Sequence, residues 1–203
     1  MSDKRFLDRV YKTSGSEAME RLYDDWADSY DAELAEAGYA TPARCARAMV
    51  ATGCTGPVLD VGCGTGLSGR AMAAAGLSPI DGTDLSAGML EVARRTGVYR
   101  RLWQQDAEKG LEVTPGSYAT IAAVGVISPG AAPAALLDNL LGLLPPGGRL
   151  AFSFNDHALA DSAYTGALGA ALESGRARQL FAENGPHIPA ESLQSTVYVL
   201  ERA

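Results

Sequence analysis

Short apolar runs alternate with amphipathic segments along most of the chain. Segments of strand length occupy residues 58–61, 78–83, 101–105, 118–127 and 149–154, and the segment at 118–127 is a nearly unbroken apolar run. Unbroken apolar runs are typical of parallel strands that are covered on both faces. Between them lie helix patterns at 41–52, 67–75, 87–96 and 160–173, and one apolar helix face formed by Leu136, Leu137, Leu140, Leu141 and Leu144. The alternation predicts an α/β fold with a doubly wound, mostly parallel sheet. Asp81, an acid inside the second segment, is left unexplained by this pattern.

Residues 1–40 precede the α/β core, which is predicted to span 41–203. The apolar residues of this extension recur at every fourth position and so share one face of a helix: Leu22, Trp26, Tyr30 and Leu34. Acidic residues fill other positions and are expected to keep the opposite face in water: Asp24, Asp25, Asp28, Asp31 and Glu33. The helix either docks on the core as ordinary packing or covers a binding site as a lid, and both interpretations can hold.

The run at 58–61 leads directly into a turn that holds three alternating glycines. Gly62, Gly64 and Gly66 lack Cβ atoms, so the chain can turn tightly and a ligand can lie against the backbone. The helix predicted at 67–75 follows, and its first N–H groups have no partner inside the helix. Asp60 adds a carboxylate beside these donors. The stretch therefore suits a ligand that carries both a carboxylate and an ammonium group.

Two known fingerprints overlap in this stretch. The acid, spacer and Gly-x-Gly-x-Gly pattern from Asp60 to Gly66 resembles motif I of the class I S-adenosylmethionine (SAM) methyltransferases. Gly64, Gly66 and Gly69 also match the Gly-x-Gly-x-x-Gly pattern of dinucleotide-binding proteins. That pattern should begin at the strand end, a place that residues 62 and 63 already fill. The methyltransferase interpretation is therefore favoured.

The resemblance implies a Rossmann-like sheet of seven strands with an antiparallel last strand, in one methyltransferase domain that spans residues 1–203. The runs at 176–183 and 195–202 are expected to form its closing antiparallel pair, joined by a loop at 184–189. The resemblance also implies SAM as the cofactor, S-adenosylhomocysteine (SAH) as the product, and in-line displacement of the methyl group by a small-molecule acceptor. The alternatives are a non-catalytic SAM-binding module and an NAD-dependent oxidoreductase.

Acidic residues follow the second and third predicted strands. Asp84 lies where nucleotide-binding α/β folds place a carboxylate on the ribose hydroxyls, although it could instead only cap the helix that begins after Ser86. By resemblance, Asp106 accepts the adenine amino group and the N–H of Ala107 binds a ring nitrogen, unless Asp106 is simply a surface acid. The cofactor contacts that the resemblance implies are Trp26, Tyr30, Asp60, Gly62, Cys63, Gly64, Gly66, Leu67, Asp84, Leu85, Ser86, Met89, Asp106, Ala107 and Val124.

Several segments are similar to the methyltransferase-like family named after the Williams–Beuren region. They include the Tyr/Trp segment of the extension, Gly38-Tyr39, Asp84-Leu85-Ser86, Gly97-Val98-Tyr99 and residues 197–200. Members of this family often carry Gly-His in the loop after the fourth strand, where this chain has Gly130-Ala131. A role for a histidine of that loop is therefore not expected.

No residue is assigned as a catalytic base. The methyl group of SAM is already activated, so a base is needed only if the nucleophile arrives protonated with a high pKa. His157 and His187 are the only histidines, and a lone loop histidine is more often structural or exposed. Tyr11, Tyr30 and Tyr39 are the other candidates.

Charge and composition exclude some classes of partner. The formal net charge of −7 argues against a nucleic-acid substrate, whose phosphates need a basic surface. No apolar run reaches about 18 residues, and the N-terminus has no apolar secretory signal, so no contact with a membrane is expected. Cys45, Cys54 and Cys63 lack the spacing of a metal site and are expected to be reduced thiols of a cytoplasmic protein. The oligomeric state is not predicted by the sequence.

Overall fold

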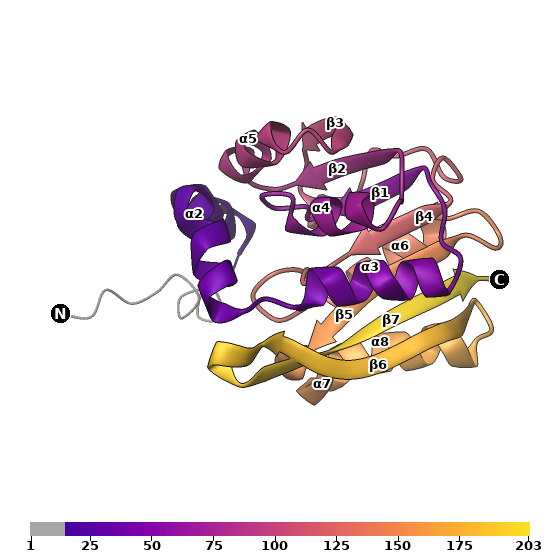
Figure 1. Ribbon diagram of the computed structural model, residues 1–203. Coiled ribbons are helices and arrows are strands. Elements are labelled where there is room, and N and C mark those ends of the chain that lie inside the picture. The colour runs from indigo at the N-terminus through magenta and orange to yellow at the C-terminus, as the bar shows by residue number, and fades with distance from the viewer. Residues whose placement is uncertain (1–14) are drawn as a thin grey trace.

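A seven-stranded sheet with the order β3-β2-β1-β4-β5-β7-β6 lies at the centre of the molecule (Figure 1). The computed structural model describes residues 15–203. Its strands are β1 (Val58–Val61), β2 (Ile80–Asp84), β3 (Tyr99–Gln104), β4 (Thr120–Ala123), β5 (Arg149–Asn155), β6 (Ala177–Ile188) and β7 (Leu193–Arg202). The strands β1 to β5 pair in parallel, and β7 is antiparallel to both β5 and β6. The predicted fold class, a doubly wound and mostly parallel sheet with an antiparallel last strand, is confirmed.

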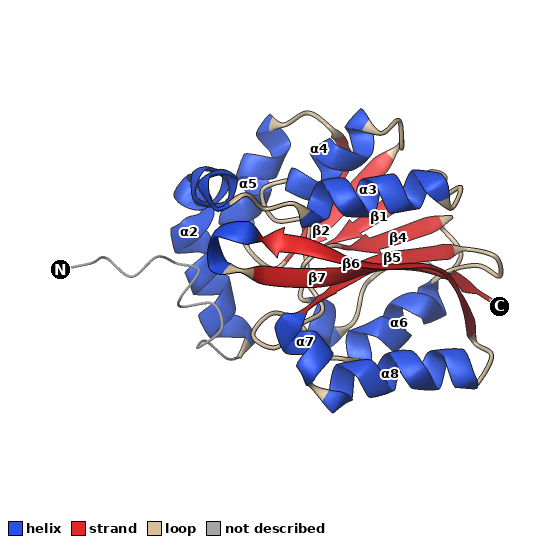
Figure 2. Cartoon of the chain, turned by 60° about the horizontal axis from the view of Figure 1, so that its bottom comes forward, coloured by secondary structure: helices blue, strands red, loops and turns tan. Residues whose placement is uncertain are grey.

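Helices cover both faces of the sheet (Figure 2). One face carries α3 (Thr41–Ala51), α4 (Leu67–Ala74) and α5 (Ala87–Arg95), and the other carries α6 (Ala135–Leu143), α7 (Asp156–Ala160) and α8 (Ser162–Glu173). Two single turns of 3-10 helix, η1 (Ala107–Lys109) and η2 (Pro189–Glu191), lie in loops. The predicted extension forms α2 (Ser16–Ala37), which lies beside the edge where the parallel strands end (Figure 1). Residues 1–14 of the extension, with Tyr11, lie outside the described residues.

The alternating direction of side chains along β1 divides the core into two layers. Leu59 and Val61 pack on the side of α6, in a cluster that also contains Phe152 of β5. Val58 packs on the side of α3 and α4, with Met72. The side chains of β1 are fully buried in both layers, as predicted for a strand that is covered on both faces.

Several element boundaries differ from the prediction. The run at 118–127 forms a strand only at Thr120–Ala123, because the backbone turns soon afterwards at Gly125, where φ is 74°. The helix predicted at 160–173 is α8 and begins at Ser162, after Asp161, whose side chain accepts a hydrogen bond from the N–H of Ala163; a separate short helix, α7, precedes it and ends at Ala160. The strand β6 continues to Ile188 because the segment expected to be a loop also pairs with β7.

The buried acid Asp81 is explained by two partners from neighbouring segments. The guanidinium of Arg100 on β3 donates from Nε and Nη2 to its two oxygens, at 2.9 and 2.6 Å, and Tyr118 Oη donates at 2.8 Å. Burial raises the pKa of Asp81, but these hydrogen bonds outweigh burial and leave the pKa below its usual value. The side chain is fully buried and paired with a cation, which satisfies the charge that the strand pattern alone left unexplained.

Candidate functional site

A cavity lies at the edge of the sheet where β1, β2 and β4 end, which is the usual place for a ligand in a doubly wound sheet. The turn after β1, the end of β2, the segments after β3 and β4, and α2 all contribute to its wall. The predicted cofactor contacts that line it are Tyr30, Gly62, Gly64, Asp84, Leu85, Met89, Asp106, Ala107 and Val124. The fold therefore gathers, around one cavity, residues that are separated by up to about a hundred positions in the sequence.

The glycine turn is held against the end of β2 by backbone hydrogen bonds. The N–H groups of Gly62 and Cys63 donate to the carbonyl of Thr83 at 2.8 and 3.0 Å. Gly64 has a φ of 54°, and a Cβ atom added there would meet no other atom within 4 Å. Gly64 also lines the cavity. A ligand can therefore approach the backbone at this position, as the lack of a side chain predicted.

Asp84 connects the glycine turn with the start of α5. Its Oδ2 accepts from the N–H of Gly64 at 2.7 Å, and its Oδ1 accepts from the N–H of Ser86 at 2.9 Å. Burial raises its pKa. Each carboxylate oxygen can accept more than one hydrogen bond, so Asp84 retains capacity for a ligand hydroxyl on the cavity side. The structure thus shows the helix-capping contact and leaves room for the ribose contact.

Asp60 lies behind the turn and does not line the cavity. Its Oδ2 accepts from Ser68 Oγ at 2.6 Å and from Tyr99 Oη at 2.7 Å, whereas its buried Oδ1 has no partner among the described residues. Burial raises the pKa of Asp60 to about 7. Thr83 Oγ1 is a second buried oxygen with no hydrogen-bond partner among residues 15–203, and Thr83 does line the cavity. Of the two, only Thr83 is on the cavity wall, and its hydroxyl can bond to a ligand there.

Five further predicted contacts are placed elsewhere by the packing. Gly66 precedes α4, and a Cβ there would lie 3.1 Å from the ring of Tyr99, so its small size serves helix packing. Ser86 is fully buried and caps α5 by accepting from the N–H of Met89 at 3.0 Å. Cys63 and Leu67 border a smaller pocket beside the glycine turn, and Trp26 is almost fully buried against the core.

Thr83 and Gln105 line the cavity but were missed by the sequence analysis. Thr83 directly precedes Asp84, and Gln105 directly precedes Asp106; both acids are predicted cofactor contacts. A polar side chain at the carboxyl end of a buried strand was the signal that could have identified both.

The helix α2 is tied to the core through two of its acids, which were expected only to keep one face of the helix in water and which also bond to α4 and α5. Asp24 Oδ1 accepts from Ser86 Oγ at 2.5 Å and from the N–H of Gly88 at 2.9 Å, at the start of α5. Asp31 accepts from Thr65 Oγ1 at 2.5 Å and from Arg70 at 2.7 Å, near the start of α4. Carboxylates are favourable at the N-terminal ends of helices. These contacts hold α2 across the cavity.

A second cavity adjoins the first on its α2 side. The two share the wall residues Tyr23, Tyr30, Gly125 and Ala131. The second is rich in aromatic rings and neutral polar groups, and no Asp, Glu, Lys or Arg of residues 15–203 lines it. Its lining includes Trp26, Tyr39, Ser128, Asn155 and His187.

The candidate bases predicted from the sequence take different places. His187 is 5% exposed and lines the second cavity, as do Tyr30 and Tyr39. His157 is exposed on α7. Among residues 15–203, no cluster of His, Cys, Asp and Glu side chains is suited to hold a metal ion, and none of the helices in this range has the length and apolarity to cross a bilayer.

Known proteins share both sequence and fold with this chain. Residues 58–148 match the model of a family described as methyltransferase domain. The human methyltransferase-like protein 27 is 33% identical over 160 residues, which cover 75% of this chain and 63% of that protein. A ubiquinone biosynthesis O-methyltransferase from Sodalis glossinidius (strain morsitans) is 35% identical over 100 residues, which cover 47% of this chain and 40% of that protein. The chain thus spans less than two thirds of the length of these relatives.

Two solved structures illustrate the shared fold. A SAM-dependent methyltransferase from Thermotoga maritima, described as a possible histamine N-methyltransferase, has a TM-score of 0.60 at 16% identity and covers 91% of this chain and 99% of its own. The magnesium protoporphyrin IX methyltransferase of Synechocystis PCC 6803, solved with bound SAM, has a TM-score of 0.57 at 18% identity and covers 100% of this chain and 92% of its own.

Residues 58–148 carry a methyltransferase domain, and the fold of the chain is the one found in solved SAM-dependent methyltransferases. The similarity to methyltransferase-like proteins that the sequence predicted is confirmed by the human relative. The Synechocystis neighbour was solved with bound SAM, the cofactor that the pattern from Asp60 to Gly66 indicated for this chain.

Proposed function

We propose that this protein transfers the methyl group of SAM to a small-molecule acceptor by in-line displacement. The observation that carries the proposal is the pair of adjoining cavities, one at the glycine turn and one beyond the shared wall of Tyr23 and Tyr30. A methyl transfer needs two sites that open towards one another, because donor and acceptor must meet in line. The first cavity has the position of a cofactor site, and the second is left for the acceptor.

The residues around the first cavity support a definite assignment of roles. Asp84 would accept from the ribose hydroxyls, Asp106 and the N–H of Ala107 would hold the adenine, and the backbone at Gly64 would lie against the methionine portion. When bound, SAM supplies a methyl group that its sulfonium already activates. The part of the chain described here then has to align the acceptor and exclude water, which lowers the barrier without a dedicated base.

A small acceptor is favoured over a macromolecule by the enclosure and by the charge. The helix α2 lies across the cavities, and the second cavity is bordered by bulky rings. The formal net charge of −7 disfavours nucleic acid. Relatives named as ubiquinone biosynthesis O-methyltransferases support a small-molecule acceptor as well. We further propose that residues 1–203 act as one domain in the cytoplasm, with 1–40 as the extension of the core at 41–203.

Calorimetry and a transfer assay test the proposal together. SAM and SAH should bind with one site per chain, and NAD should not. A screen with SAM carrying a labelled methyl group should then find label on a small acid, phenol or amine. Binding of NAD without SAM would refute the cofactor assignment. Tight SAM binding without transfer to any member of the screen would favour the alternative, a non-catalytic SAM-binding module.

A further inference from the structure

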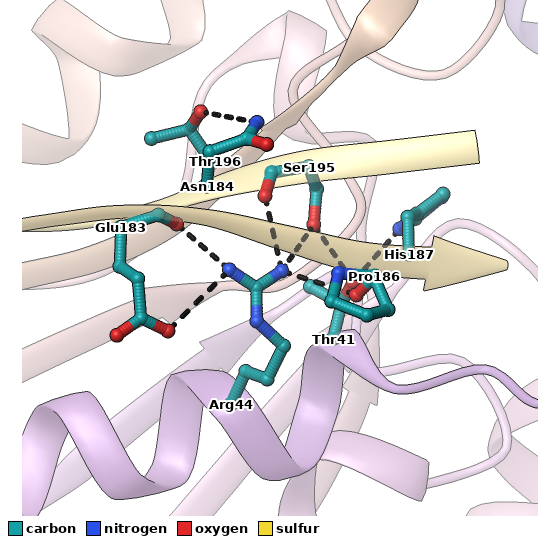
Figure 3. Close-up of polar contacts among 8 residues, drawn as sticks. All are labelled: Thr41, Arg44, Glu183, Asn184, Pro186, His187, Ser195 and Thr196. Atoms are coloured by element: carbon teal, nitrogen blue, oxygen red, sulfur yellow. Dashed lines mark hydrogen bonds and ion pairs between the residues drawn. The ribbon is translucent and has the colours of Figure 1, made fainter. Parts of the chain in front are cut away.

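His187 stands at the wall of the second cavity with one ring nitrogen already engaged. It lies near the end of β6, and its Nδ1 is 2.8 Å from Thr41 Oγ1 at the start of α3. Thr41 Oγ1 is in turn 3.0 Å from Ser195 Oγ on β7. Figure 3 shows these side chains with Arg44, which extends from α3 towards the two strands. The four residues form a continuous polar chain that ends at the cavity.

The direction of the hydrogen bonds in this chain follows from Arg44. A guanidinium can only donate, so Arg44 Nη1 donates to Ser195 Oγ at 3.1 Å as well as to the carbonyl of Ser195 at 3.0 Å. Ser195 is fully buried, and within residues 15–203 the one acceptor for its own hydroxyl hydrogen is Thr41 Oγ1. Thr41 therefore receives that hydrogen and donates its own to His187 Nδ1.

This direction determines the tautomer of the imidazole. Nδ1 accepts, so the ring hydrogen of the neutral form is on Nε2. Burial lowers the pKa of His187 to about 4, so the ring is neutral at physiological pH. No residue between 15 and 203 accepts a hydrogen bond from Nε2, and the side chain lines the second cavity. The lone pair that a general base would use is the one on Nδ1, which Thr41 already occupies.

We propose that His187 presents its Nε2–H group to the methyl acceptor and thereby selects an acceptor with an oxygen lone pair, in a carbonyl, carboxylate or phenol, on an apolar ring. The inference rests on the proposed function, because it takes the second cavity as the acceptor site. The surrounding rings of Trp26, Tyr30 and Tyr39 suit a flat apolar body. An ammonium group has no lone pair to offer and would meet a donor at this position. The selected acceptors are therefore oxygen-bearing molecules rather than cationic amines.

The tautomer is measured first, because it requires no ligand. In 15N-labelled protein, long-range correlations from the ring protons should show His187 with an unprotonated Nδ1 and a protonated Nε2. The Thr41→Val variant removes the hydroxyl that donates to Nδ1 and should shift the ring towards a mixture of tautomers. Thr41→Ser keeps the hydroxyl and should retain the wild-type tautomer. A protonated Nδ1 in the wild-type protein would overturn the inference.

Binding is measured on the SAH-saturated protein with benzoate and benzylamine, which share a ring and differ in the polar group. Benzoate should bind more tightly than benzylamine by at least tenfold. His187→Gln keeps a donor near the position of Nε2 and should retain benzoate affinity within about threefold. His187→Asn keeps a polar atom near Thr41 but withdraws the donor from the cavity, and should weaken benzoate binding by about 10- to 100-fold. Affinity for SAH should be unchanged in both variants.

Equal binding of the two probes, absence of benzoate binding, or wild-type benzoate affinity in His187→Asn would overturn the inference. These outcomes differ from failure of the proposed function, which would appear as loss of SAH binding by the wild-type protein. The tautomer measurement remains valid in that case, and unchanged SAH affinity in the variants shows that they are folded.

Discussion

The two acids that hold α2 on the core should control how often this helix opens. We expect the double variant Asp24→Ala, Asp31→Ala to keep its fold and to expose α2 and both cavities more frequently. The reason is that Asp24 holds the start of α5 and Asp31 holds Thr65 and Arg70, while the apolar face of α2 stays packed. Opening of α2 is then a local event that leaves the sheet intact.

The magnitude follows from the exposure of the contacts. A hydrogen bond to a charged group contributes about 1.5–3 kcal/mol when buried, and partial exposure reduces this. The side chain of Asp31 is 37% exposed and Asp24 is also at the surface, so about 1–1.5 kcal/mol for each carboxylate is appropriate. Loss of both should raise the opening equilibrium of α2 by about 30- to 150-fold, since 1.4 kcal/mol corresponds to a factor of ten.

Native-state hydrogen exchange measures this equilibrium directly. Amides of α2 should exchange about 30- to 150-fold faster in the double variant, whereas amides of β4 should exchange at the wild-type rate. Adding SAH should slow exchange of α2 in the wild-type protein, because Tyr30 on this helix lines the cofactor cavity.

A matched control removes the same charge from the same helix. Asp25 and Asp28 are exposed and have no hydrogen-bond or ion-pair partner within residues 15–203, so Asp25→Ala, Asp28→Ala should leave exchange of α2 nearly unchanged. If both double variants accelerated exchange equally, net charge or helix propensity would be the cause, and the role of the contacts would be refuted. If SAH left α2 unaffected, the helix would be ordinary packing and not a lid.

Three further outcomes are expected at the cofactor site. Gly64→Ala should abolish SAM binding, because the added Cβ would extend into the space proposed for the ligand. Gly97→Ala is the control, because Gly97 has a similar φ of 68° and no atom within 4 Å of an added Cβ, so this variant should bind SAM normally and carry only the backbone strain. Equal affinities of the two variants for SAM in calorimetry would contradict this prediction. Asp84→Ala should weaken SAM binding by about 10- to 150-fold, corresponding to about 1.5–3 kcal/mol, and a lowered melting temperature with unchanged affinity would leave only the helix-capping role. The pKa of Asp60 rises from 3.8 to about 7 on folding, so the ligand-free protein should lose stability as pH rises between these values, by up to about 4 kcal/mol. In urea unfolding, Asp60→Asn should lack this slope and be more stable than wild type at pH 8, and an unaltered slope would assign it to other groups.

Local patterns in the sequence predicted much of the fold and the position of the cofactor site. The apolar runs, the glycine turn after 58–61 and the acids after the second and third strands depend on neighbouring residues, because periodicity and turn chemistry act over a few positions. The same patterns misplaced the end of β4, where the backbone turns at Gly125. They correctly predicted Ser86 as the cap of the helix that follows.

The polar partners of buried groups were decided only by the tertiary structure. Asp81 is paired with Arg100 and Tyr118, which lie 19 and 37 positions away, and Thr41 meets His187 across 146 positions. A sequence pattern shows that such a group is polar but not which segment will cover it. The sequence by itself therefore predicted the sheet, its glycine turn and the resemblance to methyltransferases, whereas the packing of α2, α3 and the β6–β7 pair decided which side chains face the second cavity. The physical reason is that a buried hydrogen bond requires both partners at about 3 Å with a suitable angle, and only the completed packing brings distant segments to that distance.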